Sequence, residues 1–244
     1  MTILCIETST SVCSAAICKD GAPIRQCINQ EGSNHARLLP LYIEELLSFA
    51  RQEGLTIDAL ALSEGPGSYT GLRIGTSTAK GLCYGLNIPL IPISTPEILC
   101  EAAKQRSAIR FQPADILFPM IDARRMEVYT AIYDSQLRVD SLELKETRAR
   151  AVVVETEASL VTPSLLGEGR GETRYFYFGD GAAKCQSVLN ADNWHFIPGI
   201  VPEAQYMGAL AEGRKMISGA DLAYYEPFYL KEFVAAPSHV KGLS

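Results

Sequence analysis

An acidic residue ends a predicted strand in each half of the sequence. Glu7 ends the apolar run near the start of the chain, and Asp122 ends a similar run in the second half. The hydroxyl residues Thr8 and Ser9 follow the first acid, and Arg124 follows the second. Side chains of these types could hold a phosphate group through a metal, or act as a base. They therefore predict at most a degenerate nucleotide cleft between the two halves, unless the second acid and its neighbours only pair on the surface.

A glycine turn adds a further component to this predicted cleft. Gly179-Asp180-Gly181 follows the predicted strand 175–178, and glycines after a strand expose amide groups to an anion. The alternative is a turn that only caps the helix after it. The predicted residues of a degenerate nucleotide cleft are Glu7, Thr8, Ser9, Asp122, Arg124, Gly179, Asp180 and Gly181.

Other catalytic patterns are missing from the sequence. The glycine-rich stretch 65–71 continues without the Gly-Lys-Ser/Thr of a P-loop. His35, His195 and His239 are isolated, so no pair has the spacing of metal ligands. No Gly-x-Ser-x-Gly elbow positions a nucleophilic serine. We therefore expect no catalytic residues and no metal site.

The composition is that of an ordinary globular protein. The chain has 244 residues, 47% of them hydrophobic and 20% charged. No long apolar run predicts a signal or membrane segment, and seven scattered cysteines fit a reducing compartment, so we expect a cytoplasmic protein that does not bind membranes. A net charge of -6 argues against unaided binding to RNA, because phosphate contacts need clustered Lys and Arg.

The two halves of the sequence repeat one order of predicted elements. The matched strands are 3–7 with 117–122, 12–18 with 126–133, and 23–29 with 137–144. In each half, helices, a strand ending in a glycine turn, another helix and a final short strand follow, the last at 92–97 and 198–203. This order predicts a duplicated α/β fold of the actin, Hsp70 and sugar-kinase class, with two lobes that each hold a mixed sheet flanked by helices.

The predicted lobes divide the chain unequally. We expect the first lobe at 1–104, completed by the C-terminal segment 215–244, and the second lobe at 105–214. The charged stretch 145–174 fits no element of the repeat, and its segment 167–171 is expected to be an exposed loop.

The first predicted helix has more apolar surface than one sheet can cover. Ser33 and Asn34 are its expected caps, Pro40 places its regular part close to that proline, and Gly54 lies beyond its end. Its apolar positions are Leu38, Leu39, Tyr42, Ile43, Leu46, Leu47 and Ala50. They favour either a second partner surface or one deeply buried helix.

The second predicted helix, 70–86, contains four glycines, each about 1 kcal/mol less favourable than alanine. Small residues share one of its sides: Gly71, Gly75, Thr78, Ala79 and Leu82. Such a side lets another helix approach closely, and that packing offsets the glycines. The spacing fits both the first helix of the same chain and a helix of another chain.

Several segments resemble those of a known family. The most specific is 65–75, Gly-Pro-Gly-Ser-Tyr-Thr-Gly-Leu-Arg-Ile-Gly, followed by Ala-Lys-Gly at 79–81. Further matches, in order, are 6–9, 35–40, 122–124, 127–129, 179–181 and 227–230. Over most of its length the chain resembles the TsaB family, also called YeaZ and once labelled glycoprotease-like.

The resemblance implies an accessory role in tRNA modification. Members of this family pair with the paralogue TsaD, which transfers a threonylcarbamoyl group to the adenosine beside the anticodon of tRNAs, and the ATPase TsaE joins the complex. TsaD carries two metal-binding histidines where this chain has Thr95 and Leu99, so the resemblance implies a subunit without an active centre. We therefore expect this chain to meet tRNA indirectly, through the complex.

The resemblance also assigns the two helices to the partner interface. The implied interface residues are Leu38, Leu39, Tyr42, Leu46, Gly71, Arg73, Gly75, Thr78, Ala79 and Leu82. The same surface is expected to form a homodimer when the partner is absent. Glu7 stands where the family commonly has Asp, so we expect no tightly bound cofactor and at most weak binding of ADP or ATP.

Two alternatives belong to other classes of protein. A small-molecule kinase of the same fold would use Glu7 and Asp122 in one cleft, and sustained ATP turnover would reveal it. A metal-dependent peptidase would need a ligand pair that the sequence lacks, and stoichiometric metal in the purified protein would reveal it.

Overall fold

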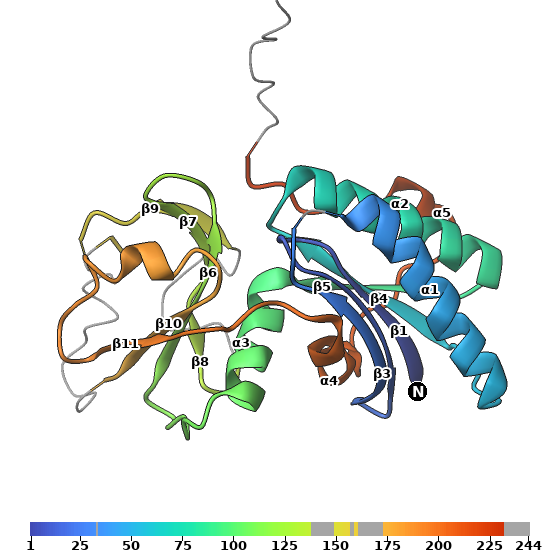
Figure 1. Ribbon diagram of the computed structural model, residues 1–244, viewed down its shortest axis with the longest axis horizontal. Coiled ribbons are helices and arrows are strands. Elements are labelled where there is room, and N and C mark those ends of the chain that lie inside the picture. Colours follow the sequence, from blue (N-terminus) through green and yellow to red (C-terminus); the bar gives the residue numbers. More distant parts are fainter. Residues whose placement is uncertain (33, 138–148, 157–158, 161–172, 232–244) are drawn as a thin grey trace, which may run out of the picture.

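Two β-sheets lie side by side in the computed structural model, with helices between them and over the outer face of the first sheet (Figure 1). The structure describes residues 1–32, 34–137, 149–156, 159–160 and 173–231. The helices are α1 (His35–Gln52), α2 (Tyr69–Leu86), α3 (Thr95–Arg106), α4 (Met207–Ala211) and α5 (Gly219–Tyr224). Helices α3 and α4 lie between the sheets, whereas α1, α2 and α5 lie on the far side of the first sheet.

The first sheet has the strand order β3-β2-β1-β4-β5. Its strands are β1 (Thr2–Glu7), β2 (Cys13–Lys19), β3 (Ala22–Asn29), β4 (Ala59–Gly65) and β5 (Leu90–Ser94). Strand β1 pairs antiparallel with β2 and parallel with β4, so the sheet is mixed. Every residue of β1 is buried, as expected for a strand covered on both faces. The predicted meander of the first three strands is confirmed.

The second sheet has the order β11-β10-β6-β7-β9, with β8 paired to β6. Its strands are β6 (Ile116–Asp122), β7 (Glu127–Thr130), β8 (Tyr133–Asp134), β9 (Arg150–Val153), β10 (Tyr175–Phe178) and β11 (Trp194–Ile197). Strand β6 is parallel to β10 and antiparallel to β7. The prediction of two mixed sheets flanked by helices is therefore confirmed. The predicted strand 137–144, from 138 on, and much of 145–174 lie outside the described residues.

Prolines explain two errors at the predicted final strands. In the first half the strand ends at Ser94 and α3 begins at Thr95, because Pro96 suits the first turn of a helix, where no amide donor is needed. In the second half the strand β11 ends before Pro198, and the predicted strand 198–203 is absent. Proline cannot donate to a sheet ladder, and Gly199 has φ +70°.

Helix α1 begins earlier than the sequence predicted. It starts at His35, and Pro40 lies inside it rather than close to its start. A proline inside a helix lacks the amide that would bond to the carbonyl four residues before, here that of Ala36. Both Ala36 and Pro40 are exposed, so solvent reaches the carbonyl and the helix tolerates the proline. Asn34 occupies the cap position without a side-chain hydrogen bond, and Ser33 lies outside the described residues.

Helix α2 agrees with the prediction at both ends. The side chain of Ser68 accepts a hydrogen bond from the amide of Gly71 at 3.3 Å, which caps the helix. The helix ends at Leu86, where Asn87 has φ 53° in the left-handed region.

Residues from the end of the described chain pack on the first sheet and its helices. Ile217 and Leu90 exchange two backbone hydrogen bonds of 2.8 Å. The ammonium group of Lys80 in α2 donates to the carbonyl oxygens of Ala223 at 2.6 Å and Tyr225 at 3.1 Å. The lobe boundaries at 104 and 214 stay a prediction.

All seven cysteines are buried and form no disulfide, as small apolar residues of the core do. Among the described residues, no helix is long and apolar enough to span a membrane.

Candidate functional site

A cleft of about 490 Å³ lies where the turn after β1 and the start of α2 face the hairpin between β6 and β7. We call it the central cleft. Its lining residues are Ser9, Thr10, Ser11, Gly67, Ser68, Tyr69, Thr70, Ile121, Asp122, Ala123, Arg124, Tyr129, Asp180, Tyr229, Leu230 and Lys231. Four residues of the predicted nucleotide cleft, Ser9, Asp122, Arg124 and Asp180, are among them.

Glu7 and Thr8 lie behind the cleft wall rather than in it. Glu7 is fully buried, and its Oε1 accepts a hydrogen bond from the amide of Ser9 at 2.5 Å. Its Oε2 has no partner among the described residues, and burial raises the pKa of the carboxyl group above its ordinary value. The hydroxyl of Thr8 donates to the carbonyl of Gly71 at 2.9 Å. These residues join β1 to α2 and do not reach a ligand in the cleft.

The β6–β7 hairpin presents Asp122 and Arg124 to the cleft. The carboxylate of Asp122 accepts from the amide of Arg124 at 3.1 Å and pairs with Lys184. Arg124 has φ 71° and Arg125 has φ 51°, a left-handed conformation that side chains other than glycine adopt at a penalty of about 1 kcal/mol or more. The tight hairpin imposes this conformation on both arginines, and Arg124 is the one that lines the cleft.

The glycines of the 179–181 turn serve packing. A Cβ on Gly179 would lie 2.2 Å from the carbonyl oxygen of Met120, and a Cβ on Gly181 would lie 2.8 Å from the carbonyl carbon of Ile121. Asp180 accepts a hydrogen bond from the amide of Asp122 at 3.1 Å. The turn therefore fixes the end of β6, and Asp180 is its contribution to the cleft.

The segment 226–231, which we call the C-terminal strap, connects the first sheet's helices with the second sheet. The amide of Phe228 donates to the carbonyl of Glu64 at 2.7 Å, and the ring of Tyr229 lies 5.0 Å from that of Tyr69. Lys231 pairs with Glu127 on β7. No motif in the sequence predicts Tyr229, Leu230 and Lys231 as cleft residues, although the resemblance at 227–230 is a signal that the segment has a role.

Many of the predicted interface residues are buried within the chain itself. Leu39, Leu46, Gly71, Gly75 and Ala79 face the sheet. A Cβ on Gly75 would lie 2.3 Å from Oγ1 of Thr8, and one on Gly71 would lie 2.0 Å from the carbonyl oxygen of Thr8. The small side of α2 that contains these two glycines is therefore required by contact with Thr8, in the turn after β1 of the same chain.

The other predicted interface residues are accessible. Leu38 and Tyr42 on α1 and Thr78 and Leu82 on α2 are half-buried, and Arg73 is exposed with its guanidinium group 4.3 Å from the ring centre of Tyr69.

The outward face of α2 carries the glycines that the fold does not explain. A Cβ on Gly81 or on Gly85 would meet nothing within 4 Å. Between them, Tyr84 is 88% exposed, and Leu86 follows at 43%. Leu41 on α1 is 56% exposed. An exposed helix face that combines small residues and large apolar side chains is typical of a surface that packs against another protein. We call Gly81, Tyr84, Gly85 and Leu86 the outer α2 face.

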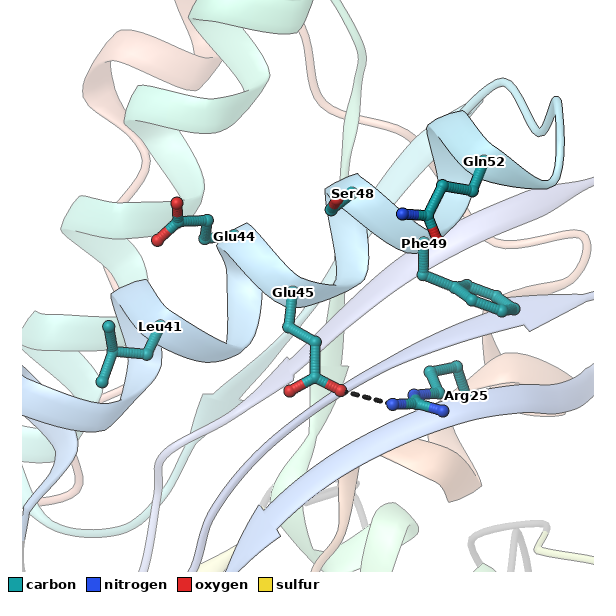
Figure 2. Close-up of a pocket in the computed structure, with 7 residues that line it drawn as sticks. All are labelled: Arg25, Leu41, Glu44, Glu45, Ser48, Phe49 and Gln52. Carbon is teal, nitrogen blue, oxygen red and sulfur yellow. Dashed lines mark hydrogen bonds and ion pairs between the residues drawn. The ribbon is translucent and has the colours of Figure 1, made fainter.

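A second hollow of about 470 Å³ lies between α1 and the edge strand β3 (Figure 2). Arg25 of β3 donates to Glu45 of α1 at 2.7 Å, and the ring of Phe49 lies beside the guanidinium group. Both partners of this ion pair are about half exposed, so it contributes little to stability.

Within the described residues, no group of three or more His, Cys, Asp and Glu side chains could hold a metal ion. His35 contacts the carbonyl of Val12 at 3.1 Å, and His195 stacks on Phe176, so both have local packing roles. Thr95 shares a hydrogen bond of 2.8 Å with Ser63 in the core.

Comparisons with known proteins agree on one family. Residues 29–161 match the family described as TsaD, tRNA N6-adenosine threonylcarbamoyltransferase. The chain is 36% identical over 129 residues to the tRNA threonylcarbamoyladenosine biosynthesis protein TsaB of Haemophilus influenzae, covering 53% of this chain and 52% of that protein. It is 36% identical over 136 residues to the protein of that name from Escherichia coli, covering 54% and 55%. The chain spans about half the length of the curated relatives it matches.

Solved structures agree over a longer range. YeaZ from Pseudomonas aeruginosa superposes with a TM-score of 0.67 at 25% identity, covering 94% of this chain and 99% of that chain. A second structure, of an uncharacterized protein from the same organism with similarity to the peptidase YEAZ, gives a TM-score of 0.69 at 24% identity, with coverage of 94% and 99%.

Proposed function

This chain belongs to the TsaD family of tRNA N6-adenosine threonylcarbamoyltransferases and, within it, to the TsaB (YeaZ) group, and from that premise we propose that it is a non-catalytic partner subunit. In this role it binds TsaD and supports formation of the threonylcarbamoyl group on the adenosine next to the anticodon of tRNAs. Relatives named as tRNA threonylcarbamoyladenosine biosynthesis proteins support the pathway.

The outer α2 face is the observation that carries the partner role. Gly81 and Gly85 destabilise an exposed helix by about 1 kcal/mol each relative to alanine. No atom of the described chain lies near enough to require either glycine. If a helix of a second protein packs across this face beside Tyr84, it explains both glycines, because residues without a side chain let that helix approach closely. TsaD is the proposed occupant, and a second copy of this chain takes its place in a homodimer when TsaD is absent.

The proposal that the chain has no catalytic site rests on its side chains. The positions that hold metal-binding histidines in TsaD, according to the resemblance, are Thr95 and Leu99 here, and both are fully buried in the core. A threonine and a leucine cannot replace two imidazole ligands. TsaE and tRNA then meet this subunit through the complex, in keeping with the net charge of -6.

Co-purification of the chain with TsaD of the same organism tests the proposal. The informative variant is Gly81→Leu, because the added side chain has free space in the isolated chain and blocks a close helix contact. Gln105→Leu, at an exposed position near the end of α3, is the matched control, since it also places a leucine on a helix surface. A substitution at Gly75 would be uninformative, because it would disturb the contact with Thr8.

We expect wild type and Gln105→Leu to form a heterodimer with TsaD, and Gly81→Leu to lose it while keeping its melting temperature. A heterodimer that survives Gly81→Leu unchanged would remove the outer α2 face from the interface. No heterodimer with the wild-type chain would contradict the partner role. The kinase alternative predicts sustained ATP turnover by the pure chain with a small hydroxylated substrate or acetate.

A further inference from the structure

Two cysteine side chains are in contact in the core of the first sheet. Cys5 on β1 and Cys18 on β2 lie on neighbouring antiparallel strands, where Cys18 pairs with Ile3, two positions from Cys5. The thiol of Cys5 donates a hydrogen bond to Sγ of Cys18 at 3.8 Å. A disulfide bond joins its sulfur atoms at about 2.05 Å, so these two sulfurs are about 1.8 Å too far apart for a bond. Rotation of the two side chains with a small shift of one strand closes such a gap.

The strand that carries Cys18 is irregular at this position. The pairing of β2 with β3 changes register between Ile17 and Cys18. A register shift of this kind interrupts the ladder and lets the strand bend locally. On the other side of the sulfur lies the backbone of Gly208 in α4, where an added Cβ would be 2.8 Å from Sγ of Cys18. The sulfur of Cys18 therefore has backbone on one side and the Cys5 thiol within contact on the other.

Cys13 belongs to the same stretch of chain, but the sheet separates it from this pair. Cys13 packs in the cluster that includes Leu39 of α1, whereas Cys5 and Cys18 pack in the cluster that includes Met207 of α4. Successive side chains of a strand point to opposite faces of its sheet, and Cys13 and Cys18 are an odd number of residues apart. In the folded chain, Cys13 therefore reaches neither of the other two thiols.

Cys18 is the more reactive member of the pair. The hydrogen bond from Cys5 lowers the pKa of the Cys18 thiol below its ordinary value, although burial opposes this shift. The thiolate is the nucleophilic form of cysteine. Cys18 is covered by α4, a helix of five residues without a side-chain cap, and its Sγ lies 3.8 Å from the carbonyl oxygen of Gln205. A short helix opens locally at a lower free energy than the strands beneath it, so an oxidant reaches Cys18 when α4 opens.

We propose that Cys5 and Cys18 form a reversible disulfide when the chain reacts with a peroxide. In the first step Sγ of Cys18 attacks one oxygen of hydrogen peroxide: an S–O bond forms, the O–O bond breaks, and the leaving hydroxide takes the thiol proton as water. In the second step Sγ of Cys5 attacks the sulfenic sulfur: the S–S bond forms, the S–O bond breaks, and a second water leaves with the proton of Cys5. Two electrons pass from the sulfurs to the peroxide.

A dithiol reverses the reaction by thiol–disulfide exchange. The pair lies beneath α4, on the opposite face of the first sheet from α2, so this proposal does not depend on the partner role.

Hydrogen peroxide added to the folded, full-length chain tests the proposal. The remaining thiols are then alkylated in denaturant, and the peptides are identified by mass spectrometry. Trypsin releases 1–19 as one peptide, because the first Lys or Arg of the chain is Lys19, and this peptide contains Cys5, Cys13 and Cys18. We expect the peptide with a single alkylated thiol, at Cys13, and with two hydrogen atoms lost from the other two. Dithiothreitol before alkylation should restore all three thiols.

Two variants and an unfolded control make the result specific. Cys13→Ala is the matched control, since it removes a buried thiol of the same peptide and should leave the disulfide in place. Cys5→Ala should stop the reaction at the sulfenic acid of Cys18, which dimedone labels. In urea, the unfolded wild-type chain should give mixed disulfides that include Cys13.

Three outcomes would overturn the proposal. One is a wild-type peptide that keeps three alkylated thiols after peroxide treatment. Another is a disulfide that includes Cys13 in the folded chain. The third is oxidation of Cys18 to the sulfinic acid to the same extent in wild type and in Cys5→Ala, because Cys5 would then play no part. If Cys5→Ala does not fold, as judged by circular dichroism, the wild-type and Cys13→Ala results decide the proposal.

Discussion

Glu7 places an acidic side chain in the apolar core, where its charged form is unfavourable. Its carboxyl group is completely buried, one oxygen accepts from Ser9, and the other has no partner in the described structure. The sequence predicted a residue of the cleft from its position at a strand end. It could not reveal that the side chain turns into the core, because that depends on how α2 packs on β1.

The buried carboxyl predicts a pH-dependent effect of Glu7→Gln. Burial raises the pKa of Glu7 in the folded protein, so its charged form opposes folding above that pKa. The penalty is absent at low pH and develops as pH rises through the folded pKa, at about 1.4 kcal/mol for each unit by which the pKa is raised. We expect Glu7→Gln to stabilise the chain at pH 8 and to lose that advantage near pH 4. Urea denaturation at several pH values measures this, and a constant difference would contradict it.

Gly75 is required by a contact within the chain. An alanine Cβ there would lie 2.3 Å from Oγ1 of Thr8, so we expect Gly75→Ala to lower the free energy of unfolding by about 1–3 kcal/mol. Thr8→Ala removes the clashing atom, and the double variant should lose less than the sum of the two single ones. If the losses in free energy of unfolding are additive in a double-mutant cycle, the contact with Thr8 is not the reason why position 75 needs a glycine.

At the scale of elements, the sequence predicted well where a local signal exists. The predicted range 70–86 agrees closely with α2, whose start is set locally by the cap that Ser68 provides. The start of α1 was mispredicted from Pro40. A helix tolerates an internal proline when solvent reaches the carbonyl of the residue four positions earlier, here Ala36, and that depends on which side of α1 faces the sheet. The sequence predicted that 215–244 completes the first lobe, but it could not predict the individual contacts of the strap and of Ile217, since neither spacing nor propensity encodes pairing with residues more than a hundred positions away.

The exposed glycines of α2 predict a stability gain upon substitution. Gly81→Ala and Gly85→Ala add a methyl group into open space and remove helix-destabilising glycines, so each should raise the free energy of unfolding by about 0.5–1 kcal/mol. The same variants should bind TsaD less tightly. Thermal denaturation and a pull-down on the same preparations measure both effects. Higher stability with unchanged binding would count against the proposed interface.

At the scale of the whole molecule, the two sheets are joined through α3, through the residues around Glu203 and through the C-terminal strap. The carboxylate of Glu203 accepts hydrogen bonds from Gln26 on β3 and Arg106 at the end of α3. On the other side, Lys231 of the strap contacts Glu127 and the ring of Tyr129 on β7. The strap is therefore one of several connections between the two sheets.

The strap predicts a measurable effect on the β6–β7 hairpin. Lys231→Ala removes the ion pair with Glu127, so we expect faster amide hydrogen exchange in 122–130, with the first sheet unchanged. Lys215→Ala is the control, because this lysine is exposed and does not line the cleft. Equal exchange in both variants would mean that the hairpin is held without the strap.

The pairing of Ile217 with Leu90 also has a consequence for synthesis on the ribosome. Strands β1 to β5 leave the ribosome early, at a rate of about 5–20 residues per second, and can begin to pair at once. The edge at β5 stays open until Ile217 has been translated, and α5 covers part of α2 only after that. The N-terminal sheet is therefore the first to emerge and the last to be completed. A nascent chain that stops before Ile217 keeps the β5 edge open to pairing with other chains.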